Sequence, residues 1–350
     1  MKTIFPIRLK RARTMRGLSM DALCGRAGNA LSKQAISKYE TGKMMPDSKS
    51  LIALANALEL PVDYFFRPTG VEIGAIEFRK KAKLGIRQID SIKEIVKDRL
   101  ERYFEIESIN DIVSESSDDY GHVTVQDEGD VYPIVAKLKS KWELGEDGIN
   151  SLIEVLEENN IKVIEIDAPK SFDGLSGYVD GHNPVVVLNA NMCSERKRFT
   201  ALHELGHLLM HFDSGLDDKR IERLCNLFAS EMLISKEMFL RKIGQRRGDI
   251  SLQELEAIQM QFGISVDALM YKARHLNIIT EHRYLTFQKK KNALGPFKDE
   301  VEKSRYKAER SCRFTRLVYR ALAGEIISVS KASALLGLPV DEVREQLNLV

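Results

Sequence analysis

The residues His203-Glu204-Leu205-Gly206-His207 form the pattern H-E-x-x-H, which places two imidazoles and a carboxylate within about one helical turn. On a helix, residues i and i+4 lie on the same face, so both imidazoles can bind one Zn²⁺ ion. Glu204 could take a proton from the attacking water and pass it to a leaving amine. The pattern predicts one zinc ion per chain and peptide-bond hydrolysis. Two solvated histidines on an amphipathic helix would give the same pattern, so the surrounding sequence must distinguish a metal site from a solvated helix face.

A catalytic zinc ion takes three protein ligands and keeps a fourth position open. Residues 222–233 have helical spacing and offer two carboxylates, Glu222 and Glu231. Glu222 is the preferred third ligand, because Asn226, one turn further on, would face the same site and could hydrogen-bond a ligand histidine. Glu231 is the alternative. Cys225 could be a soft ligand, although a buried core thiol is the better interpretation.

Other polar residues near the motif are assigned roles outside the metal ligands and the general base. His211, one turn beyond His207, could be a ligand or an oxyanion stabiliser, but an outer or structural role is preferred. Tyr178 and His182, in a Gly-rich stretch, could reach a substrate carbonyl. The following strand, Val185–Leu188, could pair with an extended substrate at a sheet edge. Gly206 lies in mid-helix, where glycine costs about 1 kcal/mol relative to alanine. We therefore expect another backbone to approach it closely.

The metal motif and the segments around it resemble the ImmA/IrrE family of bacterial metallo-endopeptidases. The resemblance covers about residues 80–240 and rests on Val186-Val187-Leu188-Asn189, on the run from Arg198 to His211, and on Glu222-x-x-x-Asn226-x-Phe228-Ala229. It implies a gluzincin-like fold, with His203, His207 and Glu222 as metal ligands and Glu204 as general base. Family members typically cleave a helix-turn-helix repressor and so induce mobile-element or stress-response genes. Cys225 departs from the family pattern, in which a small residue such as alanine is commoner.

The elements that must position these residues are predicted from periodicity. Apolar steps of three and four predict a long charged helix over 82–108, and β-branched runs predict strands over 162–166 and 184–188. The polar run 114–121 is predicted to be a loop. Further helices are predicted over 134–142, 148–159 and 195–212, within 218–232 and 252–275, and over 300–323, 330–336 and 340–347.

Residues 7–66 resemble the XRE (Cro/repressor-like) helix-turn-helix family. The resemblance is carried by Leu9-x-x-Ala12-Arg13, Gly17-Leu18-Ser19, Ser32-Lys33-Gln34-Ala35-Ile36-Ser37-Lys38-Tyr39-Glu40-x-Gly42 and Leu51-x-x-Leu54-Ala55. In such a module the second helix of the motif enters the major groove of DNA. Here that helix begins near Ser32. Asn29-Ala30 lengthens the preceding turn by two residues and could shift the recognition helix.

The recognition helix offers side chains suited to DNA. Gln34 can make a bidentate contact with adenine, and Lys33 can contact guanine or phosphate. The predicted DNA contacts are Ser32, Lys33, Gln34, Ser37, Lys38 and Lys43, the last three directed to the backbone. Arg13 with Glu40 is interpreted as a structural ion pair.

Charge divides the chain into basic ends and an acidic middle. Residues 1–70 hold 12 Lys and Arg against 5 Asp and Glu, residues 287–350 hold 13 against 8, and residues 71–286 hold 28 against 38. Basic ends favour contact with a polyanion, whereas an acidic middle would repel a phosphate backbone. The C-terminal segment could contact DNA, recruit a partner or form a plain helical cap.

The length of 350 residues predicts two or three domains in a mainly α multidomain chain. We predict an all-α five-helix helix-turn-helix domain over 1–68, an α+β zincin-like peptidase domain with a small mixed sheet over 69–280 (core 130–240), and a helical segment, helix-turn-helix-like in rhythm, over 281–350. The four cysteines lie far apart and are expected to be reduced thiols. No apolar run approaches the roughly 18 residues of a membrane helix, so a cytoplasmic protein without a membrane partner is expected.

These observations predict a DNA-binding transcriptional regulator fused to a zinc-dependent endopeptidase. Its expected partners are double-stranded operator DNA and a protein substrate, a helix-turn-helix repressor or an antitoxin whose cleavage derepresses stress-response, mobile-element or toxin-antitoxin genes. A two-fold operator would favour a homodimer. The alternative is a non-proteolytic transcription factor or antitoxin that uses the peptidase-like fold as a sensor or an interaction domain.

Overall fold

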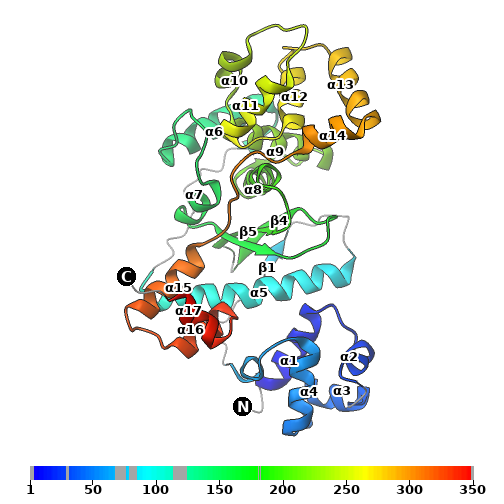
Figure 1. The fold of residues 1–350 in the computed structure, drawn as a ribbon, viewed down its shortest axis with the longest axis vertical. Coiled ribbons are helices and arrows are strands. Elements are labelled where there is room, and N and C mark those ends of the chain that lie inside the picture. The colour runs from blue at the N-terminus through cyan, green and yellow to red at the C-terminus, as the bar shows by residue number, and fades with distance from the viewer. Residues whose placement is uncertain are drawn as a thin grey trace. The chain divides into compact units, whose positions relative to one another are not determined.

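The computed structural model describes residues 4–28, 31–67, 76–78, 85–112, 124–179, 181 and 183–347. The chain divides into two compact units, one of residues 1–76, 80–114 and 312–350, the other of residues 77–79 and 115–311. Helices dominate the described residues and the sheets are small, as the sequence predicts (Figure 1). None of the described helices combines the length and the apolar character that crossing a membrane requires.

The first unit begins with four α-helices and a 3-10 helix, the five helices predicted for this region. Three side chains start helices as N-caps, because the side-chain oxygens of Ser19, Ser32 and Asp47 accept a backbone N–H three residues further on. Phe5, Leu9, Ile36 and other apolar residues form one buried core. The elements are α1 (Ile4–Met15), α2 (Met20–Arg26), α3 (Lys33–Glu40), α4 (Ser48–Leu58) and η1 (Val62–Phe66).

A long helix and the C-terminal helices complete this unit. The elements are α5 (Ile86–Ile109), α15 (Arg313–Ala323), α16 (Val329–Leu336) and α17 (Val340–Gln346). Ile106 of α5 joins Leu317, Val318 and Leu335 in a buried cluster. The three C-terminal helices therefore share one buried cluster with α5. The predicted helix over 82–108 is confirmed within the described residues.

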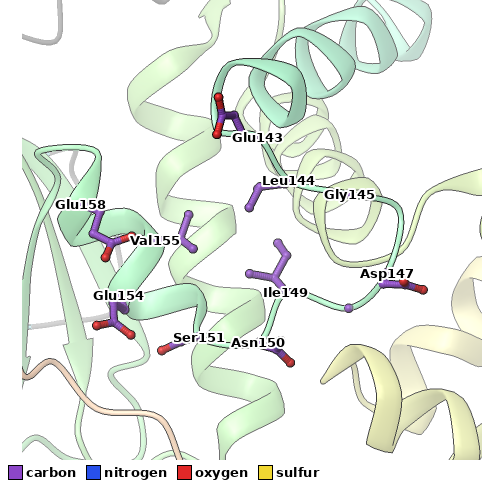
Figure 2. A pocket seen from close by; sticks show the side chains of 11 residues that line it. Glu143, Leu144, Gly145, Asp147, Ile149, Asn150, Ser151, Glu154, Val155 and Glu158 are labelled. Carbon is purple, nitrogen blue, oxygen red and sulfur yellow. The ribbon is translucent and has the colours of Figure 1, made fainter.

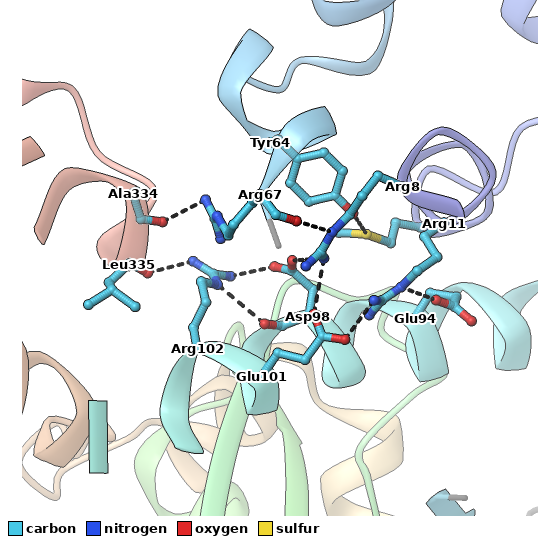
Figure 3. A network of polar contacts seen from close by, with 11 residues as sticks. Arg8, Arg11, Tyr64, Arg67, Glu94, Asp98, Glu101, Arg102, Ala334 and Leu335 are labelled. Atoms are coloured by element: carbon cyan, nitrogen blue, oxygen red, sulfur yellow. Dashed lines mark hydrogen bonds and ion pairs between the residues drawn. The ribbon is translucent and has the colours of Figure 1, made fainter. Parts of the chain in front are cut away.

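Buried ion pairs join α1 to α5 (Figure 3). Glu101 accepts hydrogen bonds from Arg8 at 3.0 Å and from Arg11 at 2.6 Å, and all three side chains are at most 8% exposed. Arg11 also pairs with Glu94 at 3.0 Å. Charge-assisted hydrogen bonds of this kind are shorter and stronger than neutral ones. Two arginines of the basic N-terminal region are thus neutralised within the chain.

Basic residues also tie the end of the chain to this unit. Arg67 and Arg102 donate to the main-chain carbonyls of Ala334 and Leu335, each at 2.8 Å (Figure 3). Lys331 pairs with Glu105, and Arg313 pairs with Glu107. Part of the positive charge of residues 287–350 therefore balances carboxylates of α5.

The second unit contains two small sheets. Its strands are β1 (Ile76–Phe78), β2 (Thr124–Val125), β3 (Lys162–Ile166), β4 (Gly174–Val179), β5 (Asn183–Asn189) and β6 (His211–Phe212). The larger sheet has the order β1-β4-β5-β3, with β3 parallel and β4 antiparallel to β5, while β2 pairs with β6. Because β5 has a partner strand on both sides, the prediction that Val185–Leu188 forms a substrate-binding edge is wrong. Both faces of β5 are buried, as is usual for an internal strand.

Helix α8 lies between the larger sheet and α9, packing against β4 and β5 on one side and against α9 on another (Figure 1). The helices are α6 (Glu128–Lys141), α7 (Leu152–Glu158), α8 (Ser194–Leu209), α9 (Asp218–Leu233), α10 (Lys236–Ile243), α11 (Leu252–Phe262), α12 (Val266–His275), α13 (Glu281–Ala293) and α14 (Gly295–Glu302). One apolar core runs through the unit and includes Phe287 of α13 and Val301 of α14.

The helix predicted over 300–323 is confirmed only at its two ends, which belong to α14 and α15, and is wrong over residues 303–312, which are not helical. Glu195 of α8 accepts hydrogen bonds from the Ser304 hydroxyl and from the backbone N–H groups of Arg305 and Tyr306. These contacts satisfy backbone donors that a helix would otherwise use. The division at residues 68 and 280 stays a prediction, and the polar run 114–121 lies outside the described residues.

Candidate metal centre

The two histidines of the H-E-x-x-H motif lie one turn apart on α8. His203 and His207 are 7% and 6% exposed, and their Nε2 atoms are 3.2 Å apart. Leu202, Leu205 and Leu208 of the same helix are buried in the apolar core. The apolar spacing of α8 thus holds both imidazoles inside the protein and on one face.

Glu222 of α9 completes a three-residue group. Its Oε1 lies 3.1 Å from His207 Nε2, and its Oε2 lies 3.2 Å from His203 Nε2. In a tetrahedral site with bonds of 2.0–2.1 Å, neighbouring ligand atoms are about 3.3–3.4 Å apart. The spacing of the two Nε2 atoms and the two carboxylate oxygens therefore suits one small cation, and one ligand atom from each residue lies within 4.8 Å of the others. Two imidazoles and one carboxylate are also the donor set of a catalytic zinc site.

The electrostatics of the group suit a cation ligand. Hydrogen bonds to the His203 and His207 imidazoles hold the pKa of the Glu222 carboxyl well below its usual value. The carboxylate is therefore ionised at neutral pH, and a ligand must be deprotonated to bind a metal.

Asn226 orients the first histidine. Its side-chain Oδ1 lies 3.0 Å from His203 Nδ1. An amide oxygen only accepts, so Nδ1 carries a proton, and a cation in the three-residue group would bind the lone pair of Nε2. The structure places Asn226 where the helical spacing predicts it.

Gly206 has the close neighbours that the sequence predicts. A Cβ atom at this position would lie 3.2 Å from Phe228 Cδ1 and 3.5 Å from Cys225 Cα. The absence of a side chain lets α9 approach α8, and this approach brings Glu222 to the two histidines.

Glu204 has a hydrogen-bond partner that sequence reasoning missed. The Ser176 hydroxyl of β4 donates to Glu204 Oε2 at 2.9 Å, and both residues are at most 2% exposed. Residues i and i+2 of a strand share a face, so Tyr178 points to the same helix. Its hydroxyl donates to the carbonyl of Leu208 at 2.8 Å. The Ser-Gly pair inside a strand of small residues is the only local signal that could have identified Ser176.

The remaining candidates lie outside the three-residue group. His211 is exposed on β6. Glu231, the alternative ligand, pairs instead with Lys272 at 2.5 Å, and both side chains are 4% exposed. Burial lowers the pKa of Lys272. His182 lies outside the described residues.

The predicted DNA-contact residues lie on and around α3. Ser32 caps the helix, Lys33, Gln34, Lys38 and Lys43 are exposed, and Ser37 is half-buried. Lys33 pairs with Asp21 at 2.7 Å, and both side chains are exposed to solvent, which screens the pair. Arg13 and Glu40 form the expected ion pair at 2.6 Å. Residues 29 and 30, where the turn was predicted to be longer, lie outside the described residues.

A separate pocket opens beside the loop between α6 and α7 (Figure 2). Its volume is about 310 Å³, and Leu144, Ile149 and Val155 lie among carboxylates at its rim. None of the three residues of the metal group lines it, so the pocket is distinct from the H-E-x-x-H chemistry.

Comparisons with known proteins identify both regions. Residues 156–274 match the peptidase-family model described as "IrrE N-terminal-like domain", and residues 9–65 match the model described as "Helix-turn-helix". Over 66 residues the chain is 36% identical to the SPbeta prophage-derived uncharacterized HTH-type transcriptional regulator YonR of Bacillus subtilis (strain 168). That match covers 19% of this chain and 59% of the relative's length. The chain therefore contains one segment similar to helix-turn-helix domains and another similar to the IrrE N-terminal-like domain.

Proposed function

We propose that the chain is a DNA-binding regulator whose second unit is a zinc-dependent endopeptidase. The observation that carries this proposal is the convergence of two Nε2 atoms and one carboxylate within 3.1–3.2 Å, inside the segment that matches a peptidase family. The proposed ligands are His203, His207 and Glu222, and Glu204 is the proposed general base. The substrate class is a helix-turn-helix repressor or an antitoxin.

The chain's own residues account for the proton transfers. A bound zinc ion would polarise the scissile carbonyl as a Lewis acid. Glu204, next to the first ligand, accepts a proton from the attacking water and returns it to the leaving amine. The Ser176 hydroxyl holds Glu204 Oε2. Asn226 keeps the lone pair of His203 Nε2 directed to the ligand group.

Removal of the metal ligands tests the proposal. We expect the full chain to bind zinc and to cleave candidate repressors encoded near its gene, and chelation to abolish cleavage. The variant with both His203→Ala and His207→Ala is expected to lose zinc and cleavage but to keep its affinity for its own promoter DNA in a gel shift. The helix-turn-helix domain does not contribute to the metal group, so the two activities separate.

One outcome would favour the rival interpretation. If the wild type cleaves no candidate while promoter binding survives the double substitution, the chain acts as a regulator and the IrrE-like domain serves as a sensor or an interaction domain. The name of the Bacillus subtilis relative, a transcriptional regulator, is compatible with either outcome.

DNA reading by α3 gives a further prediction. Gln34→Ala is expected to weaken binding to the preferred operator by about 1–3 kcal/mol, because a bidentate amide contact to adenine is lost. Base preference should relax while the dependence on salt stays unchanged. Lys38→Ala is the matched control on the same helix and should weaken binding to every sequence and reduce the salt slope by about one. Titrations of selected and scrambled duplexes at several salt concentrations measure both. Unchanged base preference in Gln34→Ala would refute this role.

A further inference from the structure

Helix α9 contacts the histidine pair through three residues on one face. Glu222, Cys225 and Asn226 are spaced i, i+3 and i+4, and such residues are neighbours on a helix surface. Glu222 contacts both Nε2 atoms, and Asn226 contacts Nδ1 of His203. The Sγ atom of Cys225 lies 3.4 Å from Nδ1 of His207. Each histidine therefore has an α9 side chain at the ring nitrogen that faces away from the ligand group.

A hydrogen bond at Nδ1 of His207 affects which ring nitrogen can bind a metal. A neutral imidazole binds a metal through the nitrogen without a proton, and the hydrogen bond at the other nitrogen decides which one that is. The Cys225 sulfur lies within hydrogen-bonding distance of Nδ1 of His207. When the sulfur accepts from Nδ1–H, Nε2 keeps its lone pair for a cation. The sulfur contacts the ring nitrogen that is joined to Nε2 through Cε1, and Cys225 is not among the three residues of the group that fits the cation.

Both residues of this contact are buried, so solvent cannot replace the sulfur as a partner of Nδ1. Cys225 is 0% exposed and His207 is 6% exposed. The close approach at Gly206, next to His207 in sequence, brings the Cys225 backbone against α8. An alanine at position 225 would leave the buried Nδ1–H of His207 without the sulfur, and losing a partner for a buried donor is costly.

We propose that Cys225 is a positioning residue for the ligand His207, setting its tautomer and ring orientation through an Nδ1–H···Sγ hydrogen bond. The inference rests on the proposed metal centre and extends it. The departure from the family pattern at position 225 thus gains a role: this chain uses a thiol on one histidine and a carboxamide on the other. The thiol is an outer partner of the metal and not a ligand.

The experiment measures metal binding by the full chain, independently of cleavage. Zinc affinity is determined by competition with a chelating indicator, and the Co²⁺-substituted protein is examined by absorption spectroscopy. Cys225→Ala is expected to lower zinc affinity about tenfold, the lower end of the range for loss of an outer partner, because sulfur is a weak acceptor. The d–d spectrum of Co²⁺ should change as His207 gains freedom. Cys225→Ser, which keeps an acceptor, should recover part of the affinity.

Two controls separate positioning from packing. Cys193→Ala removes an exposed thiol and should leave both readings at wild-type values. Thermal unfolding of each metal-free variant measures any packing defect at position 225, which would not by itself alter the Co²⁺ spectrum of the folded protein.

Defined outcomes would overturn the inference. Wild-type zinc affinity and an unchanged Co²⁺ spectrum in Cys225→Ala would refute the positioning role while leaving the metal centre intact. A thiolate-to-cobalt charge-transfer band in the wild type that disappears in Cys225→Ala would show that the sulfur is a ligand. Absence of zinc binding by the wild type would refute the proposed function together with this inference.

Discussion

Glu204→Gln is expected to lower the rate of peptide cleavage by about 10²- to 10⁴-fold, the contribution of a positioned general acid or base. Glutamine has almost the same shape as glutamate but cannot accept the proton of the attacking water. Its amide oxygen can still accept the Ser176 hydroxyl that now donates to Glu204 Oε2. The substitution therefore removes the proton acceptor and leaves the buried hydrogen bond in place.

Zinc content is the matched control for this variant. Glu204 is not part of the group formed by His203, His207 and Glu222, so Glu204→Gln should bind zinc as the wild type does. Cleavage of a candidate repressor is followed by mass spectrometry at equal zinc loading. Equal cleavage rates in both proteins would exclude Glu204 as general base.

The second large effect concerns stability. Glu309→Ala is expected to lower the free energy of unfolding of the second unit by about 3–5 kcal/mol, because it leaves a buried charge without its partner. Arg198 is 0% exposed and Glu309 3% exposed, and they form an ion pair. Arg198 also donates to the Ile149 carbonyl at 2.9 Å and lies 4.5 Å from the centre of the Tyr306 ring. It lies on α8, five residues before the first histidine of the motif.

Urea unfolding measures this loss. Trp142 is the single tryptophan of the chain and belongs to the apolar core of the second unit, so its fluorescence reports on that unit. Asp173→Ala is the exposed control: it removes the partner of Arg196, two residues from Arg198, and should cost at most about 1 kcal/mol.

A double substitution separates the charge effect from packing. Arg198→Met combined with Glu309→Leu leaves no buried charge and should cost less than Glu309→Ala alone. Equal losses of unfolding free energy for Asp173→Ala and Glu309→Ala would show that the buried Arg198–Glu309 pair stabilises the unit no more than the exposed Arg196–Asp173 pair.

Local periodicity accounts for much of the metal centre. Spacing of i and i+4 placed His203 and His207 on one face, and the same spacing placed Glu222 and Asn226 together. The helix-turn-helix region was equally legible, because Ser19, Ser32 and Asp47 are N-caps that mark where helices begin. These relations lie within single elements, where residue spacing alone sets the geometry.

Some relations between elements were not predicted from the sequence. Ser176 was missed because β4 is rich in glycine and has little β-branched signal, and its position depends on antiparallel pairing with β5. The internal position of β5 depends on strand order, which no local pattern encodes.

The conformation of residues 303–312 likewise depends on contacts with another element, which local sequence patterns do not predict. The composition of this segment allowed a helix, but hydrogen bonds to the Glu195 carboxylate and the buried ion pair between Glu309 and Arg198 hold it against α8 instead. The sequence by itself therefore determined which residues could bind a metal and which helix could read DNA. Only the tertiary structure decided which side chains contact the ligand histidines and Glu204, because contacts between distant segments depend on how whole elements pack.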